Sequence, residues 1–569
     1  MRYTFYSFLV LLALSACKTK QVAVPSLNPY QYTATKRVVA ENGAVASAHP
    51  LASKVGVEIM KAGGNAIDAA IATQLALAVV YPNAGNLGGG GFMVARLADG
   101  STVSLDYREM APSAAHRDMY LDAQGNVIEN KSLRGHLSSG VPGTVAGLFE
   151  SMKYAKLPFK QLIQPAIELA EKGFVITERE ANSLNGLQDE LAKYNTVRNA
   201  LQRERWKGGD TLIQSDLAYT LTRIRDKGAP GFYEGETARL IVEEMKRGGG
   251  IISYEDLKRY KAKWRTPHNF KYKGYEVVSM PMPSSGGVLN NQMLKMVEDR
   301  SLATYGHNSP EAVQLMAEAE RRAYADRAEY MGDPDFYKVP VTMLVSDQYI
   351  RSRMSDYQPG RAGSSEAIKP GKLPQKESEE TTHISIIDKE GNAVAVTTTL
   401  NDSYGSKTIV GGAGFLLNDE MDDFSIKPGV PNMYGAIGGE ANAIAPGKRM
   451  LSSMTPTLVL KDSKPFLVIG TPGGTTIPTS VFQTIVNVID FGLSTEEAVN
   501  KPKFHHQWLP DQIFIEKNFP QEARAALQKM GYKLTERGAI GRTEVIKVLP
   551  DGRFEAVADS RGDDGAEGF

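Results

Sequence analysis

Two adjacent threonines, Thr381 and Thr382, stand where a charged stretch meets a predicted strand in ESEETTHISIIDKEGNAVAVTTTLN. A side-chain hydroxyl is a weak nucleophile unless a base lies next to it. If the chain is cut after Glu380, the new α-amine of Thr381 provides that base, because an α-amino group with a pKa of about 7.7 to 8.0 is partly neutral at physiological pH. Thr381 is therefore a candidate N-terminal nucleophile, and the alternative is an ordinary strand threonine.

The polar segment 359–380 is the clearest internal joint in the chain. An accessible polar segment that ends at a strand can be cut without dismantling the core. A break between Glu380 and Thr381 is therefore compatible with a folded product.

Other nucleophile and metal motifs are not found in the sequence. It has no G-x-S-x-G, H-E-x-x-H or G-x-x-x-x-G-K-[ST] pattern. The glycine run 88–91 lacks the lysine and hydroxyl of a phosphate loop, so it predicts a tight turn or close backbone packing. Neighbouring His505 and His506 point in different directions, which disfavours a zinc site. We expect neither a metal nor an organic cofactor.

The composition is that of a large globular protein, with 569 residues, of which 42% are hydrophobic and 23% charged. Basic and acidic residues balance at 65 each, so charge gives no reason to expect nucleic acid or an acidic membrane surface as a partner. The single cysteine, Cys17, excludes disulfides within the chain and thiolate metal clusters. We expect a small-molecule or protein partner.

The N-terminal sequence MRYTFYSFLVLLALSAC has the pattern of an export signal, because basic Arg2 precedes an apolar run too short to span a bilayer. The small residues before Cys17 resemble the lipobox of bacterial lipoproteins, in which this cysteine becomes lipidated. The alternative is an ordinary secretory signal with a chance cysteine. We expect residues 1–16 to be the signal peptide and 17–35 a tether, on a protein that is periplasmic or at the cell surface.

Helical periodicity dominates the chain up to about residue 356. Apolar residues recur at three- and four-residue spacing in the segments 159–171, 217–227, 236–247 and 310–331. The segment 66–80, AIDAAIATQLALAVV, is largely apolar and predicts a buried helix.

Strand patterns dominate from Thr381 onward. Alternating runs joined by turn residues predict hairpins in HISIIDKEGNAVAVTTTL, PTLVLKDSKPFLVIGT and EVIKVLPDGRFEAVAD, and earlier in FMVARLADGSTVSLDYRE. The C-terminal part has few helices to cover its sheets, so both parts must pair strands into one core. The pattern predicts an α+β protein with helices over stacked sheets.

Many motifs in a fixed order resemble the γ-glutamyltransferase family, also called γ-glutamyltranspeptidases or glutathione hydrolases. They are LDYREMAP, GVPGTVAG, PSSGG, GDPDF, TTHISIIDKEGNAVAVTTTLN, LLNDEMDDFSIKPGVPNMYG, KRMLSSMTPT, GTPGG and FHHQWLPD. The resemblance runs from about residue 36 to the final DSRGDDGAEGF. It implies an αββα sandwich of the N-terminal nucleophile hydrolase type, shared by a large subunit (36–380) and a small subunit (381–569) cut from one precursor.

The resemblance also implies how the reaction proceeds. Thr381 would be the nucleophile for self-cleavage after Glu380 and then for catalysis through a γ-glutamyl-threonine acyl-enzyme, which water or an amino acid or peptide resolves. Thr399 would hydrogen-bond and orient this nucleophile. The backbone N–H groups of Gly473 and Gly474 would form the oxyanion hole.

The implied substrate site reads both charges of a γ-glutamyl group. The α-carboxylate side comprises Arg108, Ser452 and Ser453. The α-ammonium side comprises Asn401, Glu420 and Asp423. Opposite charges at the two ends suit this zwitterionic head group, and an arginine fork suits its carboxylate. Without the resemblance, the simpler interpretation is that Arg108 forms an ion pair on the surface and that residues 422–423 form a solvated turn.

Two features vary within the family. Some members have glutamine where this chain has Glu420, and either residue can accept a hydrogen bond from the ammonium group. The segment 428–439 resembles a lid present in some members, in which Tyr434 would meet Asn401 and shield the acyl-enzyme. The alternative for the rest of this segment is a Pro- and Gly-rich loop.

The leading hypothesis is a tethered γ-glutamyl hydrolase and transferase that acts on glutathione and related amides. One alternative is an amidase like the cephalosporin acylases, which is disfavoured because the two clamp sides address an amino-acid head group. Another is a surface binding lipoprotein with a dead site, which the retention of Thr381, Thr399 and the glycine pair disfavours.

Overall fold

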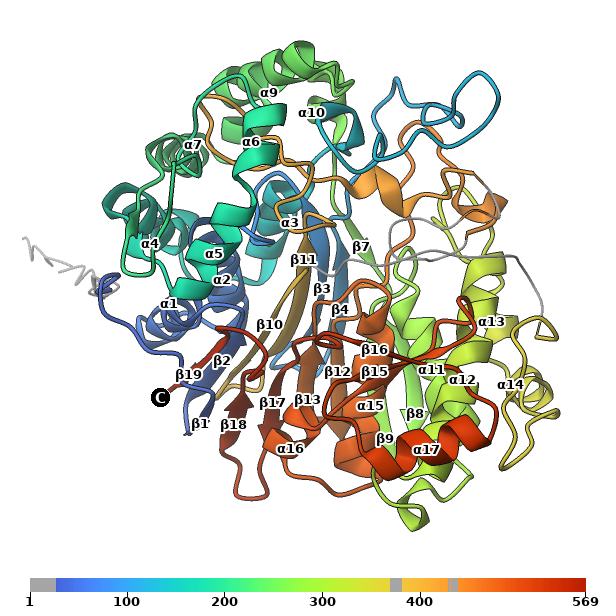
Figure 1. The fold of residues 1–569 in the computed structure, drawn as a ribbon. Helices are drawn as coiled ribbons and strands as arrows, with labels where there is room; N and C mark the ends of the chain where they lie inside the picture. The colour runs from blue at the N-terminus through green and yellow to red at the C-terminus, as the bar shows by residue number, and fades with distance from the viewer. Residues whose placement is uncertain (1–26, 369–380, 428–429, 431–437) are drawn as a thin grey trace, which may run out of the picture.

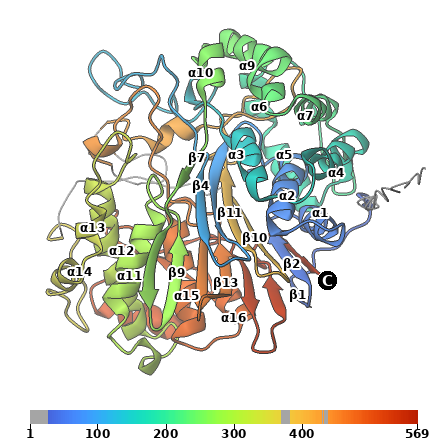
Figure 2. The same cartoon turned by 180° about the vertical axis from the view of Figure 1, so that it is seen from behind.

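Residues 27–368, 381–427, 430 and 438–569 are described in the computed structural model of the chain, and they form four layers (Figures 1 and 2). Two seven-stranded sheets lie face to face, and helices cover their outer faces. The predicted α+β class and αββα sandwich are confirmed.

The first sheet has the strand order β19-β2-β10-β11-β3-β4-β7, and all of its neighbours are antiparallel. Its strands are β2 (Gly43–Ser47), β3 (Gly90–Arg96), β4 (Thr102–Asp106), β7 (Lys263–Arg265), β10 (Thr382–Asp388), β11 (Ala393–Thr399) and β19 (Gly565–Gly568).

The second sheet has the order β1-β18-β17-β13-β12-β9-β8 and is also antiparallel throughout. Its strands are β1 (Arg37–Ala40), β8 (His268–Tyr272), β9 (Tyr275–Ser279), β12 (Thr457–Lys461), β13 (Lys464–Gly470), β17 (Glu544–Val548) and β18 (Phe554–Val557). Two smaller sheets contain β5 (Phe174–Val175), β6 (Thr211–Leu212), β14 (Phe504–His505), β15 (Ile513–Glu516) and β16 (Leu534–Arg537).

The helices divide between the two outer faces. Those before residue 260 are α1 (Pro50–Lys61), α2 (Ala66–Val80), α3 (Thr144–Ser151), α4 (Phe159–Lys172), α5 (Glu178–Gly186), α6 (Gln188–Tyr194), α7 (Ser215–Lys227), α8 (Pro230–Tyr233), α9 (Gly235–Gly248) and α10 (Tyr254–Arg259). The later ones are α11 (Gly286–Val297), α12 (Pro310–Tyr330), α13 (Val341–Leu344), α14 (Asp347–Arg353), α15 (Thr476–Ile489), α16 (Thr495–Asn500) and α17 (Gln521–Lys529). Helices α1, α2 and α3 contact the first sheet, and α11, α15 and α16 contact the second.

Side chains alternate between layers along the central strands, because successive residues of a strand face opposite sides. Ile384 and Ile386 of β10 pack in the core beneath α1 and α2, whereas Ile387 packs between the sheets. In the second sheet, Leu458 faces the first sheet and Val459 faces the helices. Both faces of each sheet are therefore buried.

Both large sheets combine strands from before and after Thr381. In the first sheet, β10 and β11 lie between β2 and β3, and in the second, β12 pairs with β9. Neither part of the chain closes a sheet alone, as the shortage of C-terminal helices predicted.

The predicted helices and hairpins are confirmed. The apolar segment 66–80 is α2 with those bounds, and the four periodic segments are α4, α7, α9 and α12. Helix α2 begins at a capping box formed by Asn65 and Asp68. Asp388, in the β10–β11 turn, accepts hydrogen bonds from the backbone N–H of Ala66 (2.8 Å) and of Asn392 (3.0 Å). One carboxylate thus joins the start of α2 to the hairpin that begins at Thr381.

Two further segments bear on the sequence analysis. The glycine run 88–91 packs closely, since a Cβ on Gly89 would lie 2.1 Å from the Thr399 carbonyl oxygen.

Within the predicted tether, Tyr32 donates a hydrogen bond to the Val175 carbonyl at 2.6 Å. The predicted signal peptide and Cys17 lie outside the described residues. Among the described helices, none is both long enough and apolar enough to cross a bilayer.

Candidate active site

The β10–β11 hairpin brings Thr381 and Thr399 together. Thr381 directly precedes β10, Thr399 ends β11, and the register of the hairpin places the two residues opposite each other. Their hydroxyl oxygens are 3.4 Å apart. Both side chains are buried, so the two hydroxyls meet at the end of the sheet with little access to bulk water.

The loop after β11 fixes the Thr399 hydroxyl. The backbone N–H of Asn401 donates to Thr399 Oγ1 at 2.8 Å. Asn401 itself has a φ of +79°, in the left-handed region that asparagine tolerates better than most residues. Its side-chain amide donates to the Asp419 carbonyl at 3.0 Å, which ties this loop to the segment that carries Glu420.

Arg108 is buried rather than a surface residue, with 1% of its area exposed. It follows β4, and its backbone N–H donates to Asp106 Oδ1 at 3.0 Å. Its guanidinium lies 2.6 Å from Glu420 Oε2 and forms an ion pair with Asp423. Burial opposes the charge, but Glu420, Asp423 and Glu109 together hold the pKa of Arg108 above its usual value. Arg108 therefore remains a cation.

The carboxylates around Arg108 come from two places. Glu420 and Asp423 lie at the two ends of a short 3₁₀ helix, Glu420–Asp423, and residues three apart on such a helix face the same way. Glu109 is fully buried, and its Oε2 is 3.6 Å from Arg108. Burial raises the pKa of Glu109 to about 8 and that of Glu420 well above its usual range. The predicted ammonium side thus already contacts the predicted carboxylate side.

The serine pair is held by residues that precede Thr381 in the chain. Ser452 donates its backbone N–H to the Pro283 carbonyl at 2.9 Å, and its carbonyl accepts from Ser285 Oγ at 2.8 Å. Ser453 Oγ accepts a hydrogen bond from Arg327 Nη2 at 3.1 Å. The PSSGG motif therefore positions the serines.

The predicted oxyanion glycines follow β13 and precede α15. Gly473 has a φ of +133° and Gly474 a φ of +52°, conformations that suit glycine. The Gly473 carbonyl accepts from the Thr476 N–H at 2.9 Å, so the turn leads directly into the helix. The N-terminus of a helix of this length carries a partial positive charge, which favours an oxyanion nearby.

These side chains line one pocket, with about 320 Å³ of space between its atoms when the part open to solvent is counted. Its lining residues are Arg108, Arg327, Thr381, Thr399, Asn401, Glu420, Asp423, Ser452, Ser453, Met454, Gly474, Thr475 and Ile477. Every predicted site residue that the structure describes is among them except Gly473, which directly precedes Gly474. Glu380 and Tyr434 lie outside the described residues.

Arg327, on α12, is a pocket residue that the sequence analysis missed. The sequence of this helix contains Arg321, Arg322 and Arg327 among acidic residues, a pattern typical of a solvated face. In the structure all three are buried, and only Arg327 of the three lines the pocket. No sequence signal separates it from the other two, because the distinction arises from packing.

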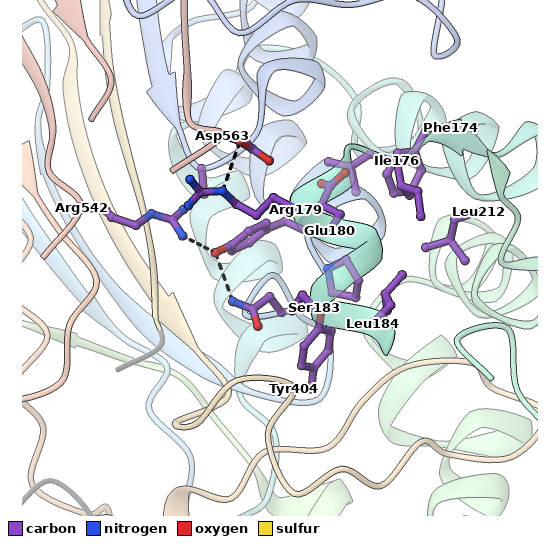
Figure 3. Close-up of a pocket in the computed structure, with 15 residues that line it drawn as sticks. Phe174, Ile176, Arg179, Glu180, Ser183, Leu184, Leu212, Tyr404, Arg542 and Asp563 are labelled. Carbon is purple, nitrogen blue, oxygen red and sulfur yellow. Dashed lines mark hydrogen bonds and ion pairs between the residues drawn. The ribbon is translucent and has the colours of Figure 1, made fainter. Parts of the chain in front are cut away.

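A larger cavity lies beside helix α5 (Figure 3). It contains about 830 Å³ of space between atoms, counting the part open to solvent. Phe174, Leu184 and Leu212 lie on one side, and Arg542 and Asp563 on the other (Figure 3). None of the predicted site residues within the described chain lines this cavity, so the pocket at Thr381 remains the candidate active site.

Comparisons with known proteins agree with this geometry. A family model described as Gamma-glutamyltranspeptidase matches residues 52–569. The glutathione hydrolase proenzyme of Escherichia coli is 48% identical over 96% of each chain, and that of Pseudomonas aeruginosa is 46% identical over 95% of this chain and 96% of its own.

Solved structures share the fold. A cephalosporin acylase from Bacillus halodurans matches with a TM-score of 0.83 at 27% identity, over 96% of this chain and 99% of its own. The gamma-glutamyltranspeptidase of Helicobacter pylori matches with a TM-score of 0.56 at 45% identity, over 60% of this chain and 97% of its own. The resemblance seen in the sequence is confirmed, and the chain belongs to the gamma-glutamyltranspeptidase family.

Proposed function

We propose that this protein cuts itself between Glu380 and Thr381 and then hydrolyses or transfers γ-glutamyl groups, with glutathione and related amides as donors. The observation that carries the proposal is the pocket in which Thr381 and Thr399 meet Arg108, Glu420 and Asp423. A hydroxyl pair supplies the nucleophile, and side chains of both charges suit the α-amino acid end of the donor.

Self-cleavage would begin at the Thr381 hydroxyl. Its Oγ attacks the Glu380 carbonyl carbon, the C–N bond of that peptide breaks, and the hydroxyl proton ends on the released nitrogen. Water then hydrolyses the resulting ester. The products are a chain that ends in the Glu380 carboxylate and a second chain that begins with the α-amine of Thr381. The 3.4 Å contact with Thr399 supports this role, since it orients the attacking oxygen.

The same oxygen would then perform the γ-glutamyl reaction. Thr381 Oγ attacks the γ-carbonyl of the donor while the α-amine takes its proton, and that proton passes to the departing amine. The acyl-enzyme is resolved by water, which gives glutamate, or by the amine of an amino acid or peptide, which gives a new γ-glutamyl amide. The turn at Gly473 and Gly474, which precedes α15, would stabilise the tetrahedral oxyanion both when the acyl-enzyme forms and when it is resolved.

The charged side chains would select the donor. The α-ammonium group of a γ-glutamyl donor can replace Arg108 as the partner of Glu420 and Asp423, while Arg108 and the two serines face its α-carboxylate. Loss of a hydrogen bond between charged groups costs about 1.5 to 3 kcal/mol, or roughly 10- to 100-fold. We therefore expect kcat/KM to be at least about tenfold higher for a γ-glutamyl anilide than for a glutaryl anilide, which lacks the ammonium group.

A comparison of three proteins tests the proposal. Wild type should separate into two chains and turn over the γ-glutamyl anilide. Thr381→Ala, which has no nucleophile, should stay uncut and inactive, and Thr381→Ser should retain part of both activities. An active Thr381→Ala protein would overturn the proposal.

A second candidate function is that of a cephalosporin-acylase-like amidase, because the Bacillus halodurans acylase shares the fold over 96% of this chain. The same two anilides separate the candidates. Equal wild-type turnover of the γ-glutamyl and glutaryl anilides would favour the amidase.

We further propose that the protein is exported and tethered through a lipid on Cys17. The signal-like N-terminus and the small residues before this cysteine support the proposal. In a bacterial host, Cys17→Ser should move the activity from the membrane fraction to the soluble exported fraction. Wild-type activity that is already fully soluble would contradict the lipid anchor.

A further inference from the structure

Arg327 is a buried cation at the wall of the pocket. It lies in the last turn of α12, and 8% of its area is exposed. Its Nε donates to Ser285 Oγ and its Nη2 donates to Ser453 Oγ, both at 3.1 Å. The side chain is thus held at two points by neutral hydroxyls.

The two pocket arginines differ in their partners. Arg108 has three carboxylates within 4 Å, those of Glu109, Glu420 and Asp423. Arg327 has no ion pair within 4 Å among the described residues; burial lowers the pKa of its guanidinium, and the electrostatic attraction of Tyr324 and Asp423 offsets this only in part. A buried charge with no counter-charge in direct contact is costly, so such a charge at a pocket wall favours an anionic ligand.

Hydroxyl groups link Arg327 to the two serines that line the pocket. Ser453 Oγ accepts from the guanidinium, so the hydroxyl hydrogen of Ser453 must be directed to another acceptor. Ser285 accepts from Arg327 and donates to the Ser452 carbonyl. Arg327 is therefore connected to Ser452 and Ser453, the two neutral residues of the predicted carboxylate side.

We propose that Arg327 supplies the counter-charge for the α-carboxylate of the γ-glutamyl donor, acting together with Ser453, and that Ser285 is the positioning residue that holds its guanidinium. This inference rests on the proposed γ-glutamyl activity and deepens it. It explains how a carboxylate can approach Arg108, around which carboxylates are already gathered. It also gives the PSSGG motif a role in substrate selection.

The test uses two anilides that differ only in the α-carboxylate. A γ-glutamyl anilide carries this group, and a 4-aminobutyryl anilide lacks it. In Arg327→Met, kcat/KM for the γ-glutamyl anilide should fall roughly 10- to 100-fold, mainly through KM, because one charged contact is lost. For the 4-aminobutyryl anilide the value should change less than about threefold, since under about 1 kcal/mol is involved. Inhibition by L-glutamate should weaken in parallel, and inhibition by 4-aminobutyrate should not.

Further variants provide controls for folding and charge. Arg117→Met removes an arginine that is half exposed and paired with Glu440, and it should leave both substrates unaffected. Ser285→Ala and Arg327→Lys disturb the same arrangement more mildly. Each should lower the preference for the γ-glutamyl anilide by roughly three- to tenfold, which corresponds to one neutral hydrogen bond. These two variants decide the question if Arg327→Met does not mature.

Two results would overturn the inference. One is an unchanged preference for the γ-glutamyl anilide in every mature Arg327 and Ser285 variant. The other is an equal loss on both anilides, which indicates a purely structural role. Failure of the proposed function itself looks different, because wild-type protein would then split into two chains but turn over no γ-glutamyl anilide.

Discussion

At the scale of single residues, the proposed chemistry depends on two threonine hydroxyls and on a cluster of opposite charges. Thr381 and Thr399 come together because a hairpin register sets them opposite each other. Arg108, Glu420 and Asp423 come together across more than 300 residues of sequence. In the structure Arg108 pairs with Glu420 and Asp423, and we propose that a zwitterionic donor exchanges these ion pairs for its own.

Thr399→Val should preserve the shape of residue 399 and remove its hydroxyl. We expect kcat to fall roughly three- to tenfold, because Thr381 loses one neutral orienting hydrogen bond, and self-cleavage to slow as well. Thr399→Ser should stay within about threefold of wild type. Stopped-time gels for cleavage and steady-state kinetics on the γ-glutamyl anilide measure both effects. Full activity in Thr399→Val would exclude the orienting role.

Glu420→Gln should be tolerated. The amide oxygen can accept a hydrogen bond from the donor ammonium group, and burial already raises the pKa of the Glu420 carboxyl well above its usual range. We expect kcat/KM to change by less than roughly fivefold, or about 1 kcal/mol. Asp423→Asn is the informative comparison. A hundredfold loss in Glu420→Gln would mean that its negative charge is required.

The residues that line the pocket were predictable only where a motif contained them. The threonines, serines and glycines each stand in a recognisable run of sequence. Arg327 does not, because its helix contains other arginines whose buried ion pairs serve the fold, such as that of Arg322 with Glu318. The pairing of Arg108 with Glu420 was also unpredictable, since sequence spacing does not show which charged side chains meet in the folded protein.

At the scale of elements, local pattern was a reliable guide. Alternation fixed the hairpins, and three- and four-residue spacing fixed α4, α7, α9 and α12, because each periodicity follows from backbone geometry. What local pattern could not give is which strands lie side by side. The insertion of β10 and β11 between β2 and β3 joins distant segments and is determined by burial of both faces.

Activity should be sensitive to any side chain added at Gly473, in the turn between β13 and α15. In Gly473→Ala, the new Cβ would lie 2.4 Å from Thr476 Oγ1 at a φ of +133°. We expect kcat to fall roughly 100- to 1,000-fold, as when an oxyanion donor is lost, with little change in KM. Gly492→Ala is the matched control, because its φ is +62° and its Cβ would meet no atom within 4 Å. Comparable activity in the two variants would exclude an oxyanion role for this turn.

At the scale of the whole molecule, buried histidines link folding to pH. Burial lowers the pKa of His383 and His505 to about 3 and that of His506 to about 4, below the ordinary value of about 6.5. The unfolded chain therefore binds protons that the folded chain does not. The contribution of these histidines to the free energy of unfolding should be highest above pH 6.5 and fall as the pH drops toward 4.

The size of this effect can be measured on the uncut Thr381→Ala chain. Each buried neutral histidine contributes at most about 1.4 kcal/mol per pH unit to the slope. His383→Gln, in which the side chain between Thr397 and Ser385 stays neutral, should reduce the slope between pH 6 and 4 by up to that amount. Urea unfolding at several pH values provides the data, and an unaltered slope would show that His383 takes up a proton in the folded state.

The shared sheets also decide what happens after cleavage. Strands from both sides of residue 381 alternate in both large sheets, so the two chains should remain one folded particle once the peptide bond is cut. Separation would require unfolding of the core rather than dissociation of an interface.

N-terminal sequencing and intact-mass measurement of the active, natively purified protein test the central claim most directly. The account predicts one particle that contains two chains, the smaller of which begins Thr-Thr-His-Ile with a free α-amine. Fully active protein that remains a single chain, or whose smaller chain begins at any other residue, would contradict it.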